Sequence, residues 1–464
     1  MRDGRPLVWL DVVGLTPRLL EHAPTLKALA VAGAMRPLSG VTPAVTLSAQ
    51  ASMLTGVLPQ QHGVVGNGWY RPELGEVRFW VQANAQLQRE PVYEKARRLA
   101  RERGSALAVA QLFWWFNQGA AVDLAVTPKP WYGSDGSKVF GIQGMPSSLA
   151  EGLERELGPF PFPSFWGPRA GLPSSLWIAQ ATAHVLRTQR PGFTLAYLPH
   201  LDYDLQRHGP QHPDVPRWVA EADRAAALVL EAARAIEATV VVMSEYGIQP
   251  VTRAVLPNRA LREAGLLAVR DGPFGEGLDP LASRAFAVCD HQLAHVYVRD
   301  RGDLEAVRGR LATLPGVGEV LAGAARSRVG LDHPRSGDLV VLAQPDAWLA
   351  YPWWLDDARA PDFARTVDIH RKPGYDPLEL FVDPALRWPA LRMARRLLAK
   401  RLGFRYRMDV VPLDPSLVRG SHGLAPADPA DGPLVLSGEA DAVEGVRALT
   451  DLPASALRHL GLEG

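Results

Sequence analysis

GVTPAVTLSAQASMLTGVLPQQHGVVGN, residues 40–67, is the stretch of this chain that most constrains its fold. A short loop leads into TLSAQASMLTG, where Ala, Gln, Met and Leu recur at helical spacing between Thr46 and Gly56. A hydroxyl at a helix N-terminus lies beside unpaired backbone N–H groups and the positive end of the helix dipole, which favour an oxyanion. Two roles therefore fit Thr46: a helix cap, which is a common role of Thr, or a nucleophile that attacks a phosphoryl group.

Three apolar segments elsewhere in the chain end at or near an acidic side chain: Asp11, Asp202 and Glu245. The segments are PLVWL (6–10), FTLAYLPH (193–200) and TVVVMSEYG (239–247). Each has the length and the apolar character of a buried strand. The carboxylate of Glu245, which follows a buried strand, needs a partner to offset its desolvation, so a metal or another cation is expected there. Asp11 could instead cap the next element, as Asp often does at a strand end.

Helices alternate with these strands. HAPTLKALAVAG, at 22–33, is predicted to be helical, and RWVAEADRAAALVLEAARAIEA carries an apolar stripe at helical spacing after the start signals Asp214 and Pro216. The alternation indicates an α/β fold with a mostly parallel central sheet and helices on both faces. Ligands of such sheets bind beyond the carboxyl ends of the strands, where the three acidic residues fall.

Two stretches depart from this alternation and divide the chain. Residues 69–170 are rich in Trp, Gly and Pro and are predicted to be a substrate-covering elaboration. Residues 280–365 contain HQLAHVYVRD, the helix DLEAVRGRLATL, and the strands GVGEVL and SGDLVVLA, and are predicted to form a small α+β insert. The core is then expected over 1–279 and 366–464, with an amphipathic terminal helix in TDLPASALRHLGLEG.

The composition is that of an ordinary globular protein. Among 464 residues, 50 Lys and Arg against 49 Asp and Glu give a net charge of +1, so no nucleic-acid or membrane partner is expected. No run reaches the roughly 18 apolar residues of a membrane span, and MRDGRPLVWLDVVG is too short in its apolar part for a signal peptide. A cytoplasmic protein is therefore expected. Cys289 is the only cysteine, so a metal would need carboxylate, imidazole or hydroxyl ligands.

With these residues, Asn67, SEYG at 244–247 and SHG at 421–423, the chain resembles the alkaline phosphatase superfamily. The most similar branch is the nucleotide pyrophosphatase/phosphodiesterase (type I phosphodiesterase) branch, with its phosphonoacetate-hydrolase-like relatives. TLSAQASMLTGVLPQQHGVVGN is similar to the nucleophile helix of that family, its LTG and HG turn and its phosphate-binding Asn. The resemblance implies that Thr46 is the nucleophile and that Asn67 holds a phosphoryl oxygen.

The resemblance also implies a site for divalent metal, with two ions in the family pattern. Its ligand positions fall on Asp11, Thr46, Asp202, Gln206, Glu245, Tyr246 and His422. Three of them depart from the family, because Gln206 stands for His, Glu245 for Asp and Tyr246 for His. Zn²⁺ or Mn²⁺ is expected. Because this oxygen-rich set is harder than the usual zinc set, it suits Mn²⁺, Mg²⁺ or iron at least as well as Zn²⁺. A site with a single ion is a further alternative.

Other polar and aromatic residues are weaker candidates. Trp115 and Tyr132 are expected to offer aromatic surface to a flat group of the substrate, or else to pack in the core. His370 and Lys372 lie in a Pro/Gly loop that is expected to border the site. In CDHQLAHVYV, alternation along a strand would place His291 and His295 on one face, and a satisfied pair is expected there.

The sequence thus predicts a metal-dependent hydrolase of phosphoric esters that acts on a small phosphorylated substrate, a diester or a pyrophosphate. The three altered ligands support an alternative of another class, a catalytically silent relative that binds a phosphorylated ligand or a partner. Hydrolysis of a phosphonate or a phosphomonoester is a third possibility. The oligomeric state stays open.

Overall fold

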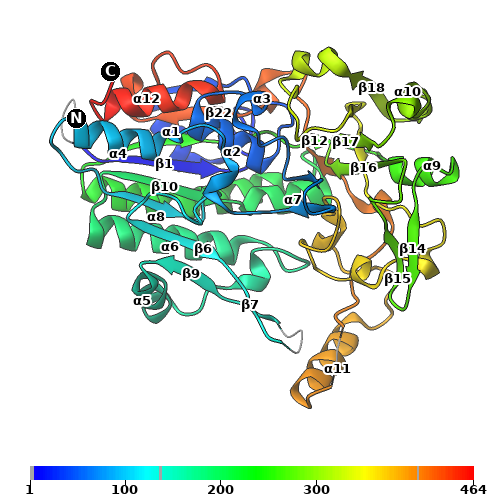
Figure 1. The fold of residues 1–464 in the computed structure, drawn as a ribbon. Helices are drawn as coiled ribbons and strands as arrows, with labels where there is room; N and C mark the ends of the chain where they lie inside the picture. Colours follow the sequence, from blue (N-terminus) through cyan, green and yellow to red (C-terminus); the bar gives the residue numbers. More distant parts are fainter. Residues whose placement is uncertain (1–4, 135–137, 405–406, 464) are drawn as a thin grey trace.

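The computed structural model describes residues 5–134, 138–404 and 407–463, and its centre is an eight-stranded sheet (Figure 1). The five middle strands run parallel, while β22 and β9 are antiparallel to their inner neighbours. In spatial order the strands are β2 (Ala34–Pro37), β22 (Leu434–Ser437), β11 (Thr239–Met243), β1 (Leu7–Val12), β10 (Phe193–Leu198), β5 (Val109–Leu112), β6 (Leu124–Pro128) and β9 (Ile142–Met145). The mostly parallel α/β fold expected from the sequence is confirmed.

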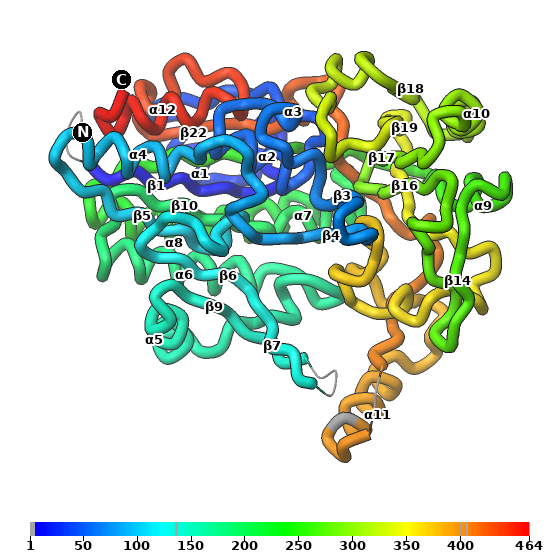
Figure 2. The backbone as a smooth tube through the Cα atoms, viewed as in Figure 1, coloured from blue at the N-terminus to red at the C-terminus, as the bar shows by residue number. Residues whose placement is uncertain are grey.

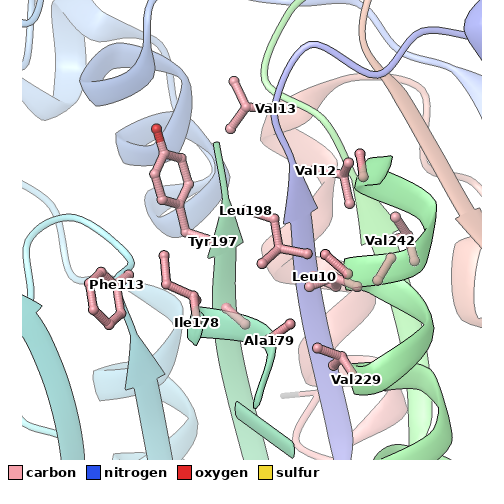
Figure 3. Close-up of a cluster of buried hydrophobic side chains, with 14 of the residues drawn as sticks. Leu10, Val12, Val13, Phe113, Ile178, Ala179, Tyr197, Leu198, Val229 and Val242 are labelled. Carbon is pink, nitrogen blue, oxygen red and sulfur yellow. The ribbon is translucent and has the colours of Figure 1, made fainter. Parts of the chain in front are cut away.

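One face of the sheet is covered by three helices, α1 (Pro24–Ala32), α6 (Leu172–Gln189) and α8 (Val215–Ala235). Because side chains alternate along a strand, Leu10 and Val12 of β1 point to this face. Figure 3 shows Leu10 among Val242 of β11 and Val229 of α8. Truncation of a side chain buried like Leu10 to Ala typically costs about 2–5 kcal/mol of stability.

The other face is covered by α2 (Thr46–Thr55), α4 (Val92–Glu102) and α12 (Leu452–His459). Leu7 and Trp9 of β1 are buried against these helices. Asp11 has the same parity along the strand as Leu7 and Trp9 and therefore points toward α2. The alternation of β1 thus directs an acidic side chain to the helix that begins with Thr46.

Residues 69–170, which we expected to cover the substrate, belong in large part to the core. They supply β5, β6 and β9 of the central sheet, together with α4 and α5 (Ser147–Leu157). The hairpins β3–β4 (Gly68–Arg71 and Glu76–Phe79) and β7–β8 (Trp131–Tyr132 and Lys138–Val139) pair outside it. The strands of the central sheet in this region were not predicted from the sequence, because they are short and lie among Trp, Gly and Pro residues.

A second, antiparallel sheet lies in the region predicted as an α+β insert. Its order is β16 (Ala285–Asp290), β17 (Leu293–Val298), β19 (Leu339–Ala343) and β18 (Val317–Ala322), with α10 (Leu304–Ala312) between β17 and β18. The predicted strand, helix and two strands are present, and β16 is an additional strand. The division of the chain at 280 and 365 stays a prediction.

The remaining elements are short or peripheral. They are α3 (Pro59–His62), α7 (His200–His208), α9 (Pro257–Glu263), α11 (Pro389–Arg401), β12 (Gln249–Pro250), β13 (Arg253–Val255), β14 (Val269–Gly272), β15 (Gly275–Leu278), β20 (Ala347–Leu349) and β21 (Gly420–Ser421). The backbone tube shows α11 standing away from the rest of the molecule (Figure 2). Within the described part of the chain, no helix has both the length and the apolar character that crossing a bilayer requires.

Candidate active site

Thr46 is the first residue of α2, and its side chain does not cap that helix. The N-cap residue is Val45, and the helix ends at Gly56, whose φ of 72° is left-handed. The backbone N–H of Leu47 donates instead to Asn67 Oδ1 at 3.0 Å. Since Asn67 satisfies this helix end from a distant loop, the hydroxyl of Thr46 is left for another role. It lies 3.1 Å from the hydroxyl of Tyr246.

Asp11 and Glu245 face each other across the amide of Gln50, which lies one turn along α2 from Thr46. Gln50 Nε2 donates to Asp11 Oδ2 at 3.2 Å and to Glu245 Oε1 at 2.7 Å. The other oxygens of the two carboxyls, Asp11 Oδ1 and Glu245 Oε2, are buried and accept no hydrogen bond from an amide, while the two carboxyls lie close enough to share a proton. We call Asp11, Glu245 and Thr46 the carboxylate half of the site.

Burial makes the acidic side chains of this site hard to ionise. Desolvation raises the pKa of Asp11 from 3.8 to about 7, and desolvation together with the charge of Glu245 raises the pKa of Asp202 from 3.8 to about 7. Burial and the neighbouring Asp11 raise the pKa of Glu245 well above its usual value. Among the described residues, no Lys or Arg forms an ion pair with any of the three. Buried carboxylates in this state bind protons or a cation.

Asp202, Gln206 and His422 form the other half of the site, which we call the amide half. Gln206 Nε2 donates to Asp202 Oδ2 at 2.7 Å, and Tyr246 donates its phenolic proton to Asp202 Oδ1 at 3.2 Å. The opposite end of the Gln206 amide accepts a hydrogen bond of 2.8 Å from Tyr375. Here both carboxylate oxygens and both ends of the amide already have protein partners.

Four aromatic rings stack against the amide half, in the order Tyr246, His422, His291 and Tyr375. Their successive centroids are 3.7, 3.7 and 3.6 Å apart. His422 Nδ1 donates to the carbonyl of Ala44 at 2.7 Å, so its Nε2 carries the lone pair and lies 3.6 Å from Asp202 Oδ1. Burial lowers the pKa of His422 well below 6.5, which keeps this ring neutral.

The two halves differ in their fit to a metal. In the carboxylate half, two carboxylate oxygens without a partner and the Thr46 hydroxyl suit one hard cation such as Mg²⁺ or Mn²⁺, completed by water and substrate oxygens. The amide half offers an Asp202 that is already bonded, the lone pair of His422 and, in the neighbouring ring, the unpartnered Nε2 of His291. No group of three or more His, Cys, Asp and Glu among the described residues is arranged to hold a metal. The two halves thus differ in which oxygen and nitrogen atoms lack a hydrogen-bond partner.

Asp290 and His291 lie in the site, although the sequence favoured a satisfied pair of His291 and His295. His291 precedes β17, in the turn after β16, with a φ of 60° that is unusual for a residue with a side chain. Asp290 accepts from His291 Nδ1 at 2.8 Å and from the backbone and side-chain nitrogens of Asn67 at 2.7 and 3.1 Å. His291 Nε2 is buried without a partner. Strand alternation could not reveal this, because a turn separates the two His residues.

His295 behaves as the sequence indicated. Its Nε2 lies 2.9 Å from the carbonyl of Val65, and its Nδ1 accepts from the backbone of Gly337 at 3.2 Å. Burial lowers the pKa of His295 to about 4. It is a structural residue that ties β17 to the loop after α3.

The four predicted substrate-binding residues separate in the structure. The backbone N–H of Trp115 donates to Gln50 Oε1 at 3.0 Å, so Trp115 borders the carboxylate half. Lys372 is buried and forms ion pairs with Asp376 and Glu379 at 2.7 and 2.8 Å. These two carboxylates balance its positive charge. The two others lie farther out, because His370 is exposed in the loop after η7 (Asp362–Arg365) and Tyr132 is exposed on β7. A small pocket beside Tyr375 is lined by Trp80, Trp166 and Lys372.

The fold and the site define a class: an α/β protein that gathers a helix-start hydroxyl and three buried acids at the carboxyl ends of neighbouring parallel strands. The model of the family type I phosphodiesterase / nucleotide pyrophosphatase matches residues 7–376. The chain therefore belongs to that family, whose members hydrolyse phosphoric esters. No curated protein matched the chain by sequence.

Solved structures of this class share the fold. Phosphonoacetate hydrolase from Sinorhizobium meliloti, in complex with phosphonoformate, is 17% identical with a TM-score of 0.59, over 98% of this chain and 96% of that one. Murine ectonucleotide pyrophosphatase / phosphodiesterase 5 is 13% identical with a TM-score of 0.58, over 99% and 95%. An inactive form of the murine protein was solved with AMP. The human counterpart is 11% identical with a TM-score of 0.59, over 99% and 96%.

Proposed function

We propose that this protein hydrolyses a phosphodiester or a pyrophosphate, with Thr46 as the nucleophile. The observation that carries the proposal is the position of Thr46 at the start of α2, beside three buried acids that have no Lys or Arg partner among the described residues. The free backbone N–H groups of a helix start favour the negative charge that develops on phosphoryl oxygens. A helix cap would not need such surroundings, and Asn67 already performs that role.

The hydrogen bonds also give the Thr46 proton a path. Because the phenolic proton of Tyr246 points to Asp202, the phenolic oxygen is free to accept from Thr46. In the first step the Thr46 oxygen bonds to phosphorus, the ester oxygen leaves, and the Thr46 proton passes by way of Tyr246 and Asp202 to that leaving oxygen. Water then cleaves the phosphoryl-Thr46 bond and restores the hydroxyl.

A single divalent cation fits this scheme in the carboxylate half. Asp11, Glu245 and Thr46 would hold it, and when bound it would neutralise phosphoryl oxygens and lower the pKa of the Thr46 hydroxyl. The amide of Gln50 orients both carboxyls by holding one oxygen of each and leaving the other free. Mn²⁺ and Mg²⁺ suit these hard oxygen ligands better than Zn²⁺ does.

Thr46→Ala tests the nucleophile, with Thr46→Ser as its matched control. Hydrolysis of bis(p-nitrophenyl) phosphate, p-nitrophenyl phosphate and phosphonoacetate would be followed with Mn²⁺, Mg²⁺ and Zn²⁺ supplied in turn. Thr46→Ala should lose at least about a thousandfold in kcat. Thr46→Ser keeps the hydroxyl and should form the corresponding phosphoryl-enzyme intermediate. Turnover by Thr46→Ala near the wild-type rate would remove the covalent mechanism. The preferred compound of the panel identifies the substrate class.

A silent relative that only binds a phosphorylated ligand is the second candidate. The closed amide half favours it, since an amide, a phenol and stacked rings occupy positions that bind metal in the family pattern. Elemental analysis of the purified protein separates the two candidates. A protein without bound divalent metal that leaves every ester intact but binds AMP in calorimetry would be the silent relative.

A further inference from the structure

The segment around α11 combines basic residues with exposed apolar side chains. Residues 384–408 contain eight Lys and Arg and no Asp or Glu, in a chain whose net charge is only +1. Six large apolar side chains of the segment are 51–68% exposed: Trp388, Leu391, Leu397, Leu398, Leu402 and Phe404. Single exposed apolar residues are ordinary on a protein surface, but six within one segment mark an interaction site.

The helix places four of these six side chains on one face. Trp388, Leu391, Leu398 and Leu402 follow helical spacing, and Arg395 lies in the same stripe. Backbone hydrogen bonds from Arg392 to Trp388 and from Leu402 to Leu398 extend the helical turns to both ends of the stripe. The face is therefore apolar with a cation in its middle.

A different face attaches the helix to the molecule. Arg392 and Arg396 both bind the carboxylate of Asp409, the first acidic residue after the basic segment. Among the described residues, Arg387, Arg395 and Arg401 have no ion pair. The cations on the outer side are thus available to a partner while others hold the helix in place.

The β7–β8 hairpin exposes a second apolar group beside the loop that leads toward α11. Trp131, Tyr132, Val139 and Phe140 are 51–70% exposed. The charges of Asp368 and Arg371 act on Tyr132, which places the hairpin near this loop. In Figure 1, α11 and β7 reach out at the same lower edge of the molecule.

We propose that the outer face of α11 docks on an anionic lipid bilayer, with the β7–β8 hairpin as a second contact. A basic amphipathic helix lies in the bilayer interface with its Leu and Trp side chains among the acyl chains and its cations at the lipid phosphates. Arg395 reaches the phosphates by extending its aliphatic stem. This departs from our sequence-based expectation of no membrane partner. That expectation used the net charge of the whole chain, which does not show that basic residues are concentrated in one segment.

Two other partners fit the surface less well. A nucleic acid would match the cations but not six exposed apolar side chains. A second copy of this chain, related by a twofold axis, would place the same basic segments against each other. Their cations would repel, because the segment contains no acidic residue to pair with them. Anionic lipid satisfies both the charge and the apolar surface.

Co-sedimentation of the full chain with vesicles tests the docking. The wild type should bind vesicles that contain about 30% phosphatidylglycerol, bind phosphatidylcholine vesicles far more weakly, and be released by about 0.5 M NaCl. Arg395→Gln with Arg401→Gln should weaken binding by roughly 30-fold, since each cation near the surface contributes about a tenfold change or less. Leu391→Ser, Leu398→Ser and Leu402→Ser together should abolish it.

Matched controls change similar residues elsewhere. Arg224→Gln with Arg234→Gln alters two exposed cations of α8, and Val31→Ser with Leu281→Ser and Leu355→Ser alters three exposed apolar side chains. Both control variants should bind like the wild type, and all variants should keep the wild-type melting temperature. Absence of binding to anionic vesicles overturns the proposal. So does a leucine variant that binds as tightly as the wild type, salt-sensitive binding to a DNA duplex without vesicle binding, or a dimer in light scattering that the leucine variant dissolves.

Discussion

The carboxylate half and the amide half of the site meet at Tyr246, but they differ in how many of their carboxylate oxygens accept a hydrogen bond. In the carboxylate half, Gln50 binds one oxygen of Asp11 and one of Glu245 and leaves the other two without partners. In the amide half, Gln206 and Tyr246 occupy both oxygens of Asp202. Residues that depart from the family pattern therefore differ in whether they leave an oxygen open to a ligand. Glu245 keeps an open oxygen, whereas Gln206 closes the position it occupies.

The largest expected effect separates the halves by their affinity for a cation. Asp11→Asn removes a charged ligand from the open half and should weaken Mn²⁺ binding at least about 100-fold and kcat about a thousandfold. Asp202→Asn, in the closed half, should change the Mn²⁺ affinity less than tenfold. Isothermal titration calorimetry measures both affinities. Equal losses in the two variants would show that the halves hold metal together.

Tyr246→Phe tests the boundary between the halves. The substitution keeps the ring against His422 but removes the hydroxyl between Thr46 and Asp202, so kcat should fall about 100-fold while Mn²⁺ affinity stays within a factor of about three. Tyr375→Phe, at the other end of the ring stack, removes only the bond to Gln206 and serves as the control. Single-turnover kinetics on both variants distinguishes the proton path from packing. Similar rates for the two variants would argue against the path.

A gain of metal would show why the amide half is closed. Gln206→His combined with Tyr246→His removes the amide and the phenol that occupy Asp202 and restores the residue types of the family pattern. The variant should bind a second Zn²⁺, because the new imidazoles join Asp202 and the lone pair of His422. Elemental analysis after dialysis would count one ion in the wild type and two in the variant. A single ion in both would mean that the ring stack, rather than the ligand identity, closes the site.

The smallest expected effect is a pH dependence of stability. The pKa of Asp11 is about 7 in the folded protein and near 3.8 when unfolded, so the folded state binds the extra proton. The metal-free protein should therefore lose stability as pH rises from about 4 to above 7, and Asp11→Asn should flatten this slope. Melting temperatures in EDTA across this range measure it. Saturating Mn²⁺ should stabilise the wild type most at the alkaline end, where the carboxyls are ionised.

Much of the fold and part of the site could be read from the sequence. The apolar strands before Asp202 and Glu245 and the helix between Thr46 and Gly56 follow from local hydrophobic pattern and stop signals, and the structure has them within a few residues. The strands inside 69–170 were missed because they are short and lie among Trp, Gly and Pro. Asp290 and His291 were underrated because they lie at the end of β16 and in the turn after it, where strand alternation no longer predicts the direction of a side chain.

The α/β alternation, the family and the set of chemical groups at the strand ends follow from residue type and spacing along the chain. Which of these groups meet depends on the packing of the folded chain. In the folded chain, Asn67 rather than Thr46 caps α2, and Gln50 orients two carboxyls. Lys372 forms ion pairs with Asp376 and Glu379. The physical reason is that hydrogen bonds and ion pairs in a buried site join residues far apart in sequence, so partner choice depends on packing that no local pattern encodes.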